Sequence, residues 1–411
     1  MSDHRESPGF SRGEEVKCLG PHVEAWAYLD NAASTPVLPE VAEAMLAVMR
    51  PEDGRFANPS SVHRWGLAAS QALAAARRVV ADAVGATPGE IVFTSGGTEA
   101  NHLAIGGVAR ARARQGRHVI TTAIEHRSVL DACTALEAQG WEISRLPVGR
   151  DGRVRPADVA AAVRPGTVLC TLAHVNNEVG AVQPVAEVAA ALRLAGGAAL
   201  HVDGVQALGK VPTPYAAWGV TLASLSAHKI GGPKGCGALY VRQGTRLVPP
   251  VGGEQEGGLR PGTENVPGIV GLGQAVRLLP RWTPGLAALK RSLVRGLLLA
   301  LPGLAVNGPD WEDETVSAPH IVNLDFSEVS RLPAEVLLHA FEAHGVASSA
   351  GSACSARRPG PSHVLTALGL PGPTLQGSLR FSLGPTTGRD EVELAVRRIP
   401  AALVALGAAA R

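Results

Sequence analysis

The hydrophobic residues of the chain follow two patterns that alternate from residue 91 to residue 241. Short apolar runs of four or five residues are typical of strands buried on both faces of a parallel sheet. They occur at 91–94, 118–122, 168–172, 199–202, 222–225 and 238–241. Longer stretches with apolar residues at helical spacing lie at 99–114, 128–139, 156–164 and 184–195. This alternation predicts an α/β domain whose helices connect the strands of a mostly parallel sheet.

The pattern changes towards both ends of the chain. Residues 26–30 read as a short strand, the Gly-rich segment 252–263 interrupts the alternation, and a helix at 285–300 leads into a mixed α+β region. A chain of 411 residues is also long enough for two domains. The predicted division is a disordered N-terminal extension at 1–25, a small α+β domain made of 26–37 and 285–411, and a large α/β domain at 38–284.

Composition narrows the class of protein. A formal net charge of +2 from interspersed acids and bases favours neither a nucleic-acid nor a membrane partner. No stretch approaches the roughly 20 apolar residues of a membrane span, and residues 1–25 lack the apolar core of a signal peptide. The cysteines are scattered without CxxC spacing, which argues against a zinc site or a disulfide framework and favours a reducing compartment. We therefore expect a cytoplasmic protein without a bound metal.

Lysines are rare enough to be considered individually, since only five occur among the 38 basic residues. Lys229 closes the sequence Ser-Ala-His-Lys at 226–229, directly after the apolar run at 222–225. A lysine at the carboxyl edge of a parallel sheet faces the crevice where ligands bind, and desolvation would lower its pKa as an imine-forming amine requires. The sequence is typical of the lysine site of a pyridoxal 5'-phosphate (PLP) enzyme. Lys234 lies in a Gly/Pro turn, and Lys210 is expected to be solvated.

The segment 94–101 runs from a strand through a Gly-rich turn into a helix that opens at Thr98. Free backbone N–H groups and the positive helix end make such a turn a phosphate site. An ordinary βα turn with a threonine cap is the alternative for this motif taken alone. The motifs GxxxxGK[ST] and GxGxxG are absent, which favours a single phosphate over a nucleotide. Ser226 and His228 could reach the same phosphate.

Polar residues follow other apolar runs as well. In a PLP site, a carboxylate such as Asp203 keeps the pyridine nitrogen protonated, so that the ring accepts electrons. Gln206 lies within reach of the phenolic oxygen of the ring. His126 could stack on the ring and shuttle protons, and Asn177 lies just beyond another strand. Four strand ends with polar residues exceed what a purely structural sheet requires.

Cys354 lies in the stretch 348–356, which consists mostly of small residues and has too little apolar bulk to form core. Buried cysteines usually behave as small inert hydrophobes, whereas a thiol on such a loop is accessible. Together with a Schiff-base lysine, this cysteine indicates an enzyme that takes sulfur from an amino acid.

From about residue 27 to residue 390, the chain resembles the cysteine desulfurases of the class V aminotransferase group of PLP enzymes. The GSACSA sequence around Cys354, without a His-His pair before the cysteine, is similar to the first of two desulfurase subgroups. The resemblance implies a fold-type I architecture, with a mostly parallel seven-stranded sheet between helices and a smaller α+β domain. Matching stretches are 29–36, 58–63, 94–101, 125–126, 174–180, 201–206, 226–237, 255–266, 351–354 and 380–384.

The resemblance also implies a role for each site residue. Lys229 would form the Schiff base with PLP, while Asn177 and Arg380 would hold the substrate carboxylate, the arginine with two hydrogen bonds. Cys354 would be the nucleophile that takes the sulfur as a thiolate. Thr263 would reach the phosphate in a partner subunit, which implies a homodimer. The other implied cofactor contacts are Gly97, Thr98, Ser226 and His228 at the phosphate, and His126, Asp203 and Gln206 at the ring.

The implied reaction converts L-cysteine to L-alanine and leaves a persulfide on Cys354. The persulfide sulfur would then be transferred to an iron–sulfur scaffold, a sulfur carrier or a thiolation pathway. The chain departs from the family pattern at Ala350 and Glu254, where Ser and Gly are usual. The segment after Gly384 is also shorter than in relatives with a long tail. The acceptor is therefore open, and a small thiol is expected to serve.

Three alternatives remain at this point. A selenocysteine lyase would use the same scaffold, and a class V aminotransferase would give no reason for the Cys354 loop. A non-catalytic sulfur-relay protein that has kept the fold is the third alternative. The presence of Lys229, Asp203 and His126 argues against this one.

Overall fold

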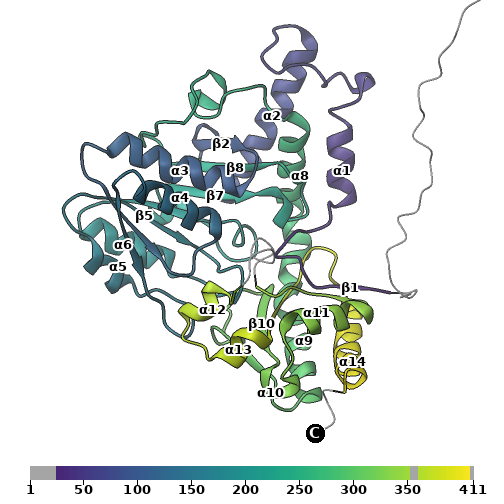
Figure 1. The fold of residues 1–411 in the computed structure, drawn as a ribbon. Coiled ribbons are helices and arrows are strands. Elements are labelled where there is room, and N and C mark those ends of the chain that lie inside the picture. The colour runs from purple at the N-terminus through teal and green to yellow at the C-terminus, as the bar shows by residue number, and fades with distance from the viewer. Residues whose placement is uncertain (1–24, 352–359, 408–411) are drawn as a thin grey trace, which may run out of the picture.

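The computed structural model describes residues 25–351 and 360–407, and its central feature is a seven-stranded sheet between helices (Figure 1). The strand order is β2-β8-β7-β6-β5-β3-β4. The strands are β2 (Ile91–Thr94), β3 (His118–Thr122), β4 (Glu142–Leu146), β5 (Thr167–Ala173), β6 (Ala199–Asp203), β7 (Leu222–Ser226) and β8 (Gly237–Val241). Only β8 runs antiparallel to its neighbours. The predicted α/β fold with a mostly parallel seven-stranded sheet is confirmed.

Alternating side chains of the strands point to opposite faces of the sheet, as the two-residue period requires. In β2, Ile91 and Phe93 belong to one hydrophobic core and Val92 belongs to another. The first core lies under α1, α2, α6 and α8, and the second lies under α3 and α4. These helices and α5 are α1 (Pro39–Leu46), α2 (Arg64–Ala83), α3 (Gly97–Arg112), α4 (Arg127–Glu137), α5 (Pro156–Ala162), α6 (Val185–Leu194) and α8 (Val266–Trp282).

A second, smaller sheet lies below the first in Figure 1. Its antiparallel strands are β9 (Ala305–Asn307), β10 (Ile321–Asp325) and β12 (Ser378–Ser382), and a parallel pair joins β1 (Ala27–Tyr28) to β11 (Val346–Ala347). A separate core contains Phe326, Phe341 and Phe381. The helices of this region are α9 (Leu286–Ala300), α10 (Ser327–Ser330), α11 (Ala334–Ala343), α12 (His363–Ala367), α13 (Gly372–Gly377) and α14 (Arg389–Ala405). The domain boundaries at 37/38 and 284/285 stay a prediction.

The elements of the large layer that the apolar runs missed include the strand β4 and the long helices α2 and α8. β4 is an edge strand whose exposed or half-exposed side chains include Glu142 and Arg145, so it carries no continuous apolar run. α2 buries mainly small residues such as Ala69 and Ala76, which give weak periodicity, and it packs along α8. Of the helices that the structure describes, none is long and apolar enough to cross a membrane.

Lys210 is buried, so the expectation that it is solvated is wrong. The residue is only 9% exposed. The turn after β6 tucks under α8, where a Cβ atom at Gly209 would lie 2.4 Å from Leu279. Burial, and then the neighbouring charge of Lys229, lower the pKa of Lys210 to about 7. The sequence around Lys210 does not predict this burial, because the charged groups near its side chain, Lys229 and His320, come from distant parts of the chain.

We predict that Lys210→Met stabilises the protein near pH 6 by at most about 5 kcal/mol, since lowering the amine pKa from 10.5 to about 7 costs about 1.4 kcal/mol per pH unit. The folded-state pKa lies below the unfolded value of 10.5. The unfolded chain therefore binds more protons between about pH 7 and pH 10.5, and wild-type stability rises with pH in that window. Urea unfolding at several pH values measures the difference, which should shrink towards pH 10. Parallel pH curves for the two proteins would contradict the burial of a charged amine.

Candidate active site

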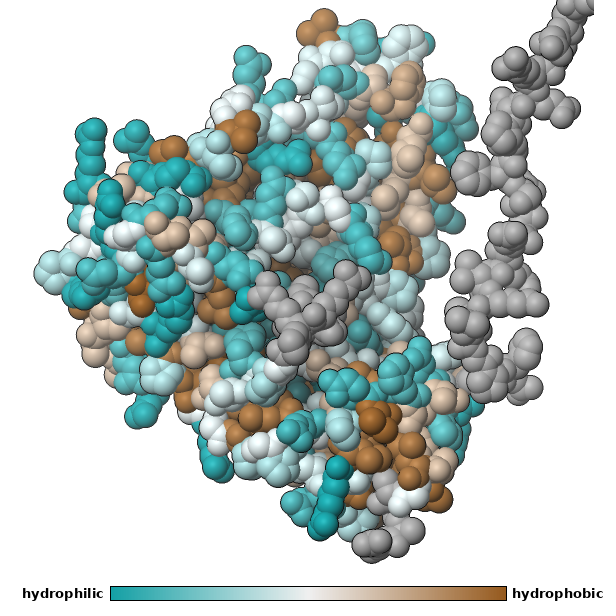
Figure 2. Space-filling view, in the orientation of Figure 1, coloured by the Kyte–Doolittle hydropathy of each residue, from teal (hydrophilic) through white to brown (hydrophobic). Residues whose placement is uncertain are grey.

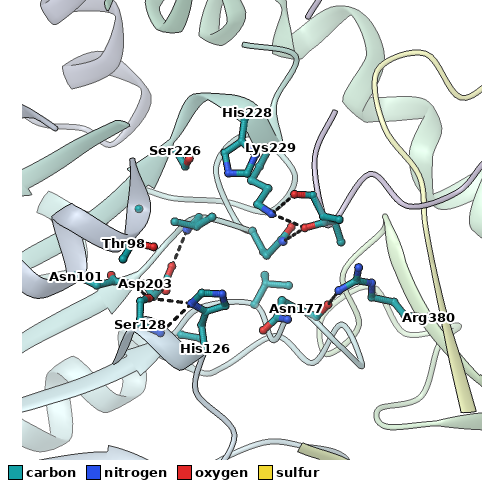
Figure 3. A pocket seen from close by; sticks show the side chains of 17 residues that line it. Thr98, Asn101, His126, Ser128, Asn177, Asp203, Ser226, His228, Lys229 and Arg380 are labelled. Atoms are coloured by element: carbon teal, nitrogen blue, oxygen red, sulfur yellow. Dashed lines mark hydrogen bonds between the residues drawn. The ribbon is translucent and has the colours of Figure 1, made fainter. Parts of the chain in front are cut away.

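A cavity of about 300 Å³ opens at the carboxyl ends of β3, β5, β6 and β7, at the edge that faces the smaller sheet (Figure 3). Parallel pairing brings these ends together, and ligands of open α/β sheets bind at such an edge. The structure brings ten of the twelve predicted site residues to this cavity. They are Gly97, Thr98, His126, Asn177, Asp203, Gln206, Ser226, His228, Lys229 and Arg380.

Lys229 reaches the cavity from a single 3-10 turn, η3 (Ala227–Lys229), that directly follows β7. Its Nζ donates hydrogen bonds to the carbonyl oxygens of Ala32 (2.6 Å) and Ala33 (2.7 Å), on the loop between β1 and α1. Lys234, the rival in the sequence, is exposed and does not line the cavity. Among the described lysines, Lys229 is therefore the one placed for covalent chemistry on a bound ligand.

The N-terminus of α3 lies on one wall of the cavity and is a candidate anion site. Its N-cap residue, Gly96, offers no side-chain cap to the helix. Gly97 has no side chain to cover the backbone at this point. A Cβ atom there would lie 2.5 Å from Val205, so a larger residue does not fit without a shift. The hydroxyl oxygen of Ser226 is buried without a hydrogen-bond partner among the described residues. Uncapped backbone N–H groups, the helix dipole and an unsatisfied hydroxyl together fit a phosphate group.

His228 contributes a neutral ring beside this anion site. Burial, followed by the positive charges of Lys229, Lys234 and Lys210, lowers the pKa of His228 to about 3. Its ring can therefore donate one hydrogen bond to an anion without carrying charge of its own.

Asp203 lies at the end of β6 with both carboxylate oxygens engaged. Oδ1 accepts from the backbone N–H of Val205 (3.1 Å), and Oδ2 accepts from the side-chain amide of Asn101 (2.7 Å). A carboxylate held in this way can pair with a protonated ring nitrogen.

His126 ends the β3–α4 loop and caps α4. Its Nδ1 lies 2.8 Å from the hydroxyl oxygen of Ser128 and accepts the backbone N–H of the same residue (3.2 Å). The amide of Asn101 donates to that hydroxyl as well (2.9 Å). Neither Asn101 nor Ser128 was predicted from the sequence, although both line the cavity.

Gln206 is fixed at both ends of its amide. Nε2 donates to the carbonyl of Ala32 (2.9 Å), the group that also accepts from Lys229. Oε1 lies 3.3 Å from Nε2 of His320, a buried histidine whose pKa falls well below its usual value because of desolvation. A neutral His320 donating from Nε2 explains why the amide nitrogen of Gln206, and not its oxygen, faces Ala32.

Arg380 enters the cavity from β12 of the smaller sheet and is 1% exposed. Nη2 pairs with Oδ1 of Asp30 (2.6 Å), and Nη1 donates to the carbonyl of Asn177 (3.0 Å). The Nε atom has no hydrogen-bond partner among the described residues. A guanidinium with spare donor capacity at a cavity wall is suited to a carboxylate ligand.

One predicted site residue does not line the cavity, and another lies outside the described residues. Thr263 is exposed, in the segment between η4 (Gln255–Gly258) and α8, and does not line this chain's cavity. Cys354 lies outside the described residues. The described cysteines are all buried, and burial raises the thiol pKa of Cys133 and of Cys236 to about 12. Such thiols are poor nucleophiles.

Comparisons with known proteins agree with this geometry. The family model for "Aminotransferase class-V" matches residues 27–394. The chain is 42% identical to a cysteine desulfurase IscS of Methanosarcina thermophila over 91% of each chain, and 44% identical to one of Anaeromyxobacter sp. strain K over 90% of each. Among solved structures it is similar to a NifS-like protein (TM-score 0.83, 32% identity, 92% and 99% covered). It is also similar to "SspA in complex with cysteine" (TM-score 0.77, 36% identity, 88% and 100% covered).

Proposed function

Because the chain belongs to the cysteine desulfurases of the class V aminotransferase family, we propose that it removes sulfur from L-cysteine with PLP as its cofactor. The observation that carries this proposal is the placement of Lys229 in one cavity with an uncapped helix N-terminus, Asp203 and Arg380. The amine would bind the aldehyde of PLP, the helix N-terminus its phosphate, and the carboxylate its ring nitrogen. The guanidinium would bind the carboxylate of an amino acid. A cysteine-bound neighbour, SspA, supports the choice of amino acid.

The residues present fit PLP. The unsatisfied hydroxyl of Ser226 and the open backbone at Gly97 and Thr98 would hold its phosphate, with His228 beside them. Asp203 would pair with the ring nitrogen. The remaining contacts would come from His126 on the ring face, Gln206 and Asn177 at the phenolic oxygen, and Lys229 at the aldehyde carbon.

When bound, PLP supplies an electron sink that makes bonds to the α- and β-carbons of an amino acid labile. Arg380 and Asn177 orient the substrate by its carboxylate. Lys229 carries a proton between the substrate carbon and its own amine. The thiolate of Cys354 takes the sulfur atom, so that L-cysteine and one thiol become L-alanine and one persulfide, with no other oxidant or reductant.

We also propose a homodimer, in which Thr263 serves the partner subunit's phosphate site. Two features of this chain support it. Thr263 is exposed and away from its own cavity. Large apolar side chains gather on the surface over α1 and the start of α2 (Figure 2), and such patches mark protein interfaces. They are Leu46, Met49, Phe56, Val62, Trp65 and Leu67.

The persulfide would pass to a small thiol or to a protein acceptor such as an iron–sulfur scaffold or a sulfur carrier. We place the enzyme in the cytoplasm on the basis of its scattered cysteines, which have no CxxC spacing. Transfer to dithiothreitol needs no docked protein, so it measures the chemistry independently of the acceptor.

The Cys354→Ala variant tests the proposed function. We expect the wild-type holoenzyme to release alanine and, with dithiothreitol, sulfide in equal amounts from L-cysteine. The variant should bind PLP and L-cysteine but form no persulfide, because it lacks the acceptor thiol. Cys133→Ala removes a buried thiol of raised pKa and is the matched control, with activity near wild type.

Peptide mass spectrometry should find the added sulfur on Cys354 and, after borohydride reduction, the pyridoxyl group on Lys229. Full sulfide release by Cys354→Ala, or the pyridoxyl group on Lys210 or Lys234, would contradict the assignment. A parallel assay with selenocysteine separates a desulfurase from a selenocysteine lyase.

The phosphate site predicts that Gly97→Ala weakens PLP binding about tenfold or more, since overpacking costs roughly 1–3 kcal/mol. The added methyl group would collide with Cγ2 of Val205. A second substitution, Val205→Ala, removes that atom, so it should recover most of the affinity in the Gly97→Ala background. Fluorescence titration with PLP gives the four dissociation constants of the cycle. If the two substitutions changed the free energy of PLP binding additively, the collision with Val205 would not be the reason for a glycine at position 97.

The dimer predicts that Phe56→Asp, which introduces a charge into the apolar surface, shifts the protein towards monomer. Leu194→Asp is the matched control, because Leu194 is exposed on α6, away from that surface. Analytical ultracentrifugation at several concentrations measures both. A monomeric wild type with full PLP occupancy would rule out a site completed by the partner.

A further inference from the structure

A chain of four hydrogen-bonded side chains connects two walls of the cavity. The Asn101 amide donates to the carboxylate of Asp203 (2.7 Å) and to the hydroxyl of Ser128 (2.9 Å). That hydroxyl lies 2.8 Å from Nδ1 of His126. Asn101 and Ser128 are buried, and Figure 3 shows them beside Asp203 and His126.

The direction of each hydrogen bond in this chain can be assigned. The backbone N–H of Ser128 donates to Nδ1 of His126 at 3.2 Å, so Nδ1 presents a lone pair and carries no proton. The hydroxyl of Ser128 already accepts from Asn101 and gives its own hydrogen to the same lone pair. Both donors therefore require the proton of a neutral ring to be on Nε2.

We infer that Ser128 and Asn101 are positioning residues that hold His126 as the neutral tautomer with its proton on Nε2. Nδ1 is turned to the start of α4, and the opposite ring edge, with the Nε2–H donor, is left for the cavity. His126 then serves as a flat surface and a fixed hydrogen-bond donor. The catalytic consequence rests on the proposed function, whereas the tautomer itself does not.

The charges around the ring agree with a neutral imidazole. Burial is the main cause that lowers the pKa of His126, and Lys229 and His363 add to it. The carboxylates of Asp203 and Asp131 act in the opposite direction without restoring the ordinary value. An imidazolium at neutral pH would also have to displace two donors from Nδ1.

A histidine held in this state can gain a proton only at Nδ1, where the two donors of Ser128 lie. The protonation state of the ring is therefore set by its contact with Ser128, which is the contact that substitutions of Ser128 change.

Nitrogen NMR of the holoenzyme labelled with ¹⁵N-histidine tests the inference, with the His126 signals identified by their loss in His126→Asn. We expect an unprotonated Nδ1 and a protonated Nε2, unchanged between pH 6 and pH 9. In Ser128→Ala the hydroxyl donor is gone, so the protonated ring is less disfavoured. His126 should then titrate at higher pH than in the wild type. Ser128→Thr keeps a hydroxyl and should restore the wild-type signals.

Ser144→Ala is the matched control, because the Ser144 hydroxyl lies 2.8 Å from Nε2 of His118, at the opposite end of β3. It should change the signals of His118 and leave those of His126 and the activity as they were. A proton on Nδ1, an imidazolium at pH 7, or identical His126 signals in Ser128→Ala would overturn the inference.

Alanine release from L-cysteine is measured on the same samples and separates this test from that of the proposed function. Absent turnover with the expected tautomer refutes the function alone. Normal turnover with a proton on Nδ1 refutes the role of Ser128 and Asn101 alone.

Discussion

The parallel pairing of β3, β5, β6 and β7 is the constraint on which the site depends. It brings residues from distant parts of the sequence to one edge, where each strand ends in a polar residue or leads into a loop that carries one. Ser226, Asp203 and the loops after Ala173 and Thr122 thus meet without any local sequence relation. The strands need only be apolar enough to be buried on both faces. Nearly all of their residues are buried.

The smaller sheet supplies what this edge lacks. β12 contributes Arg380, and the loop after β1 contributes Asp30 and the carbonyl of Ala32, which accepts from Lys229. The Asp30–Arg380 pair is almost buried on the arginine side, so removing one partner would leave a costly unpaired charge. The cavity therefore depends on both layers, and its geometry is preserved only while they stay docked.

Much of this arrangement could be predicted from the sequence, because strand cores and strand-end motifs are local signals. Lys229 stood out since it follows an apolar run directly. Asn101 and Ser128 did not, because their hydrogen bond joins α3 to α4 across 27 positions, which only the fold reveals. Lys210 was misjudged for the same reason, because its burial depends on tertiary contacts that the local sequence does not show.

The balance of charge at the cavity argues for what it binds. Lys229, Arg380 and the nearby Lys210 bring positive charge, which the carboxylates of Asp203 and Asp30 offset only in part. Burial lowers the pKa of His228, and the positive charges of the neighbouring lysines lower it further. This effect of the lysines agrees with an excess of positive charge at the cavity. A phosphate at the N-terminus of α3 and a substrate carboxylate at Arg380 would supply the missing negative charge. Each would lie beside a cation in a partly desolvated site, where charge pairing is stronger than in water. Binding both anions therefore relieves an electrostatic cost that the folded chain carries by itself.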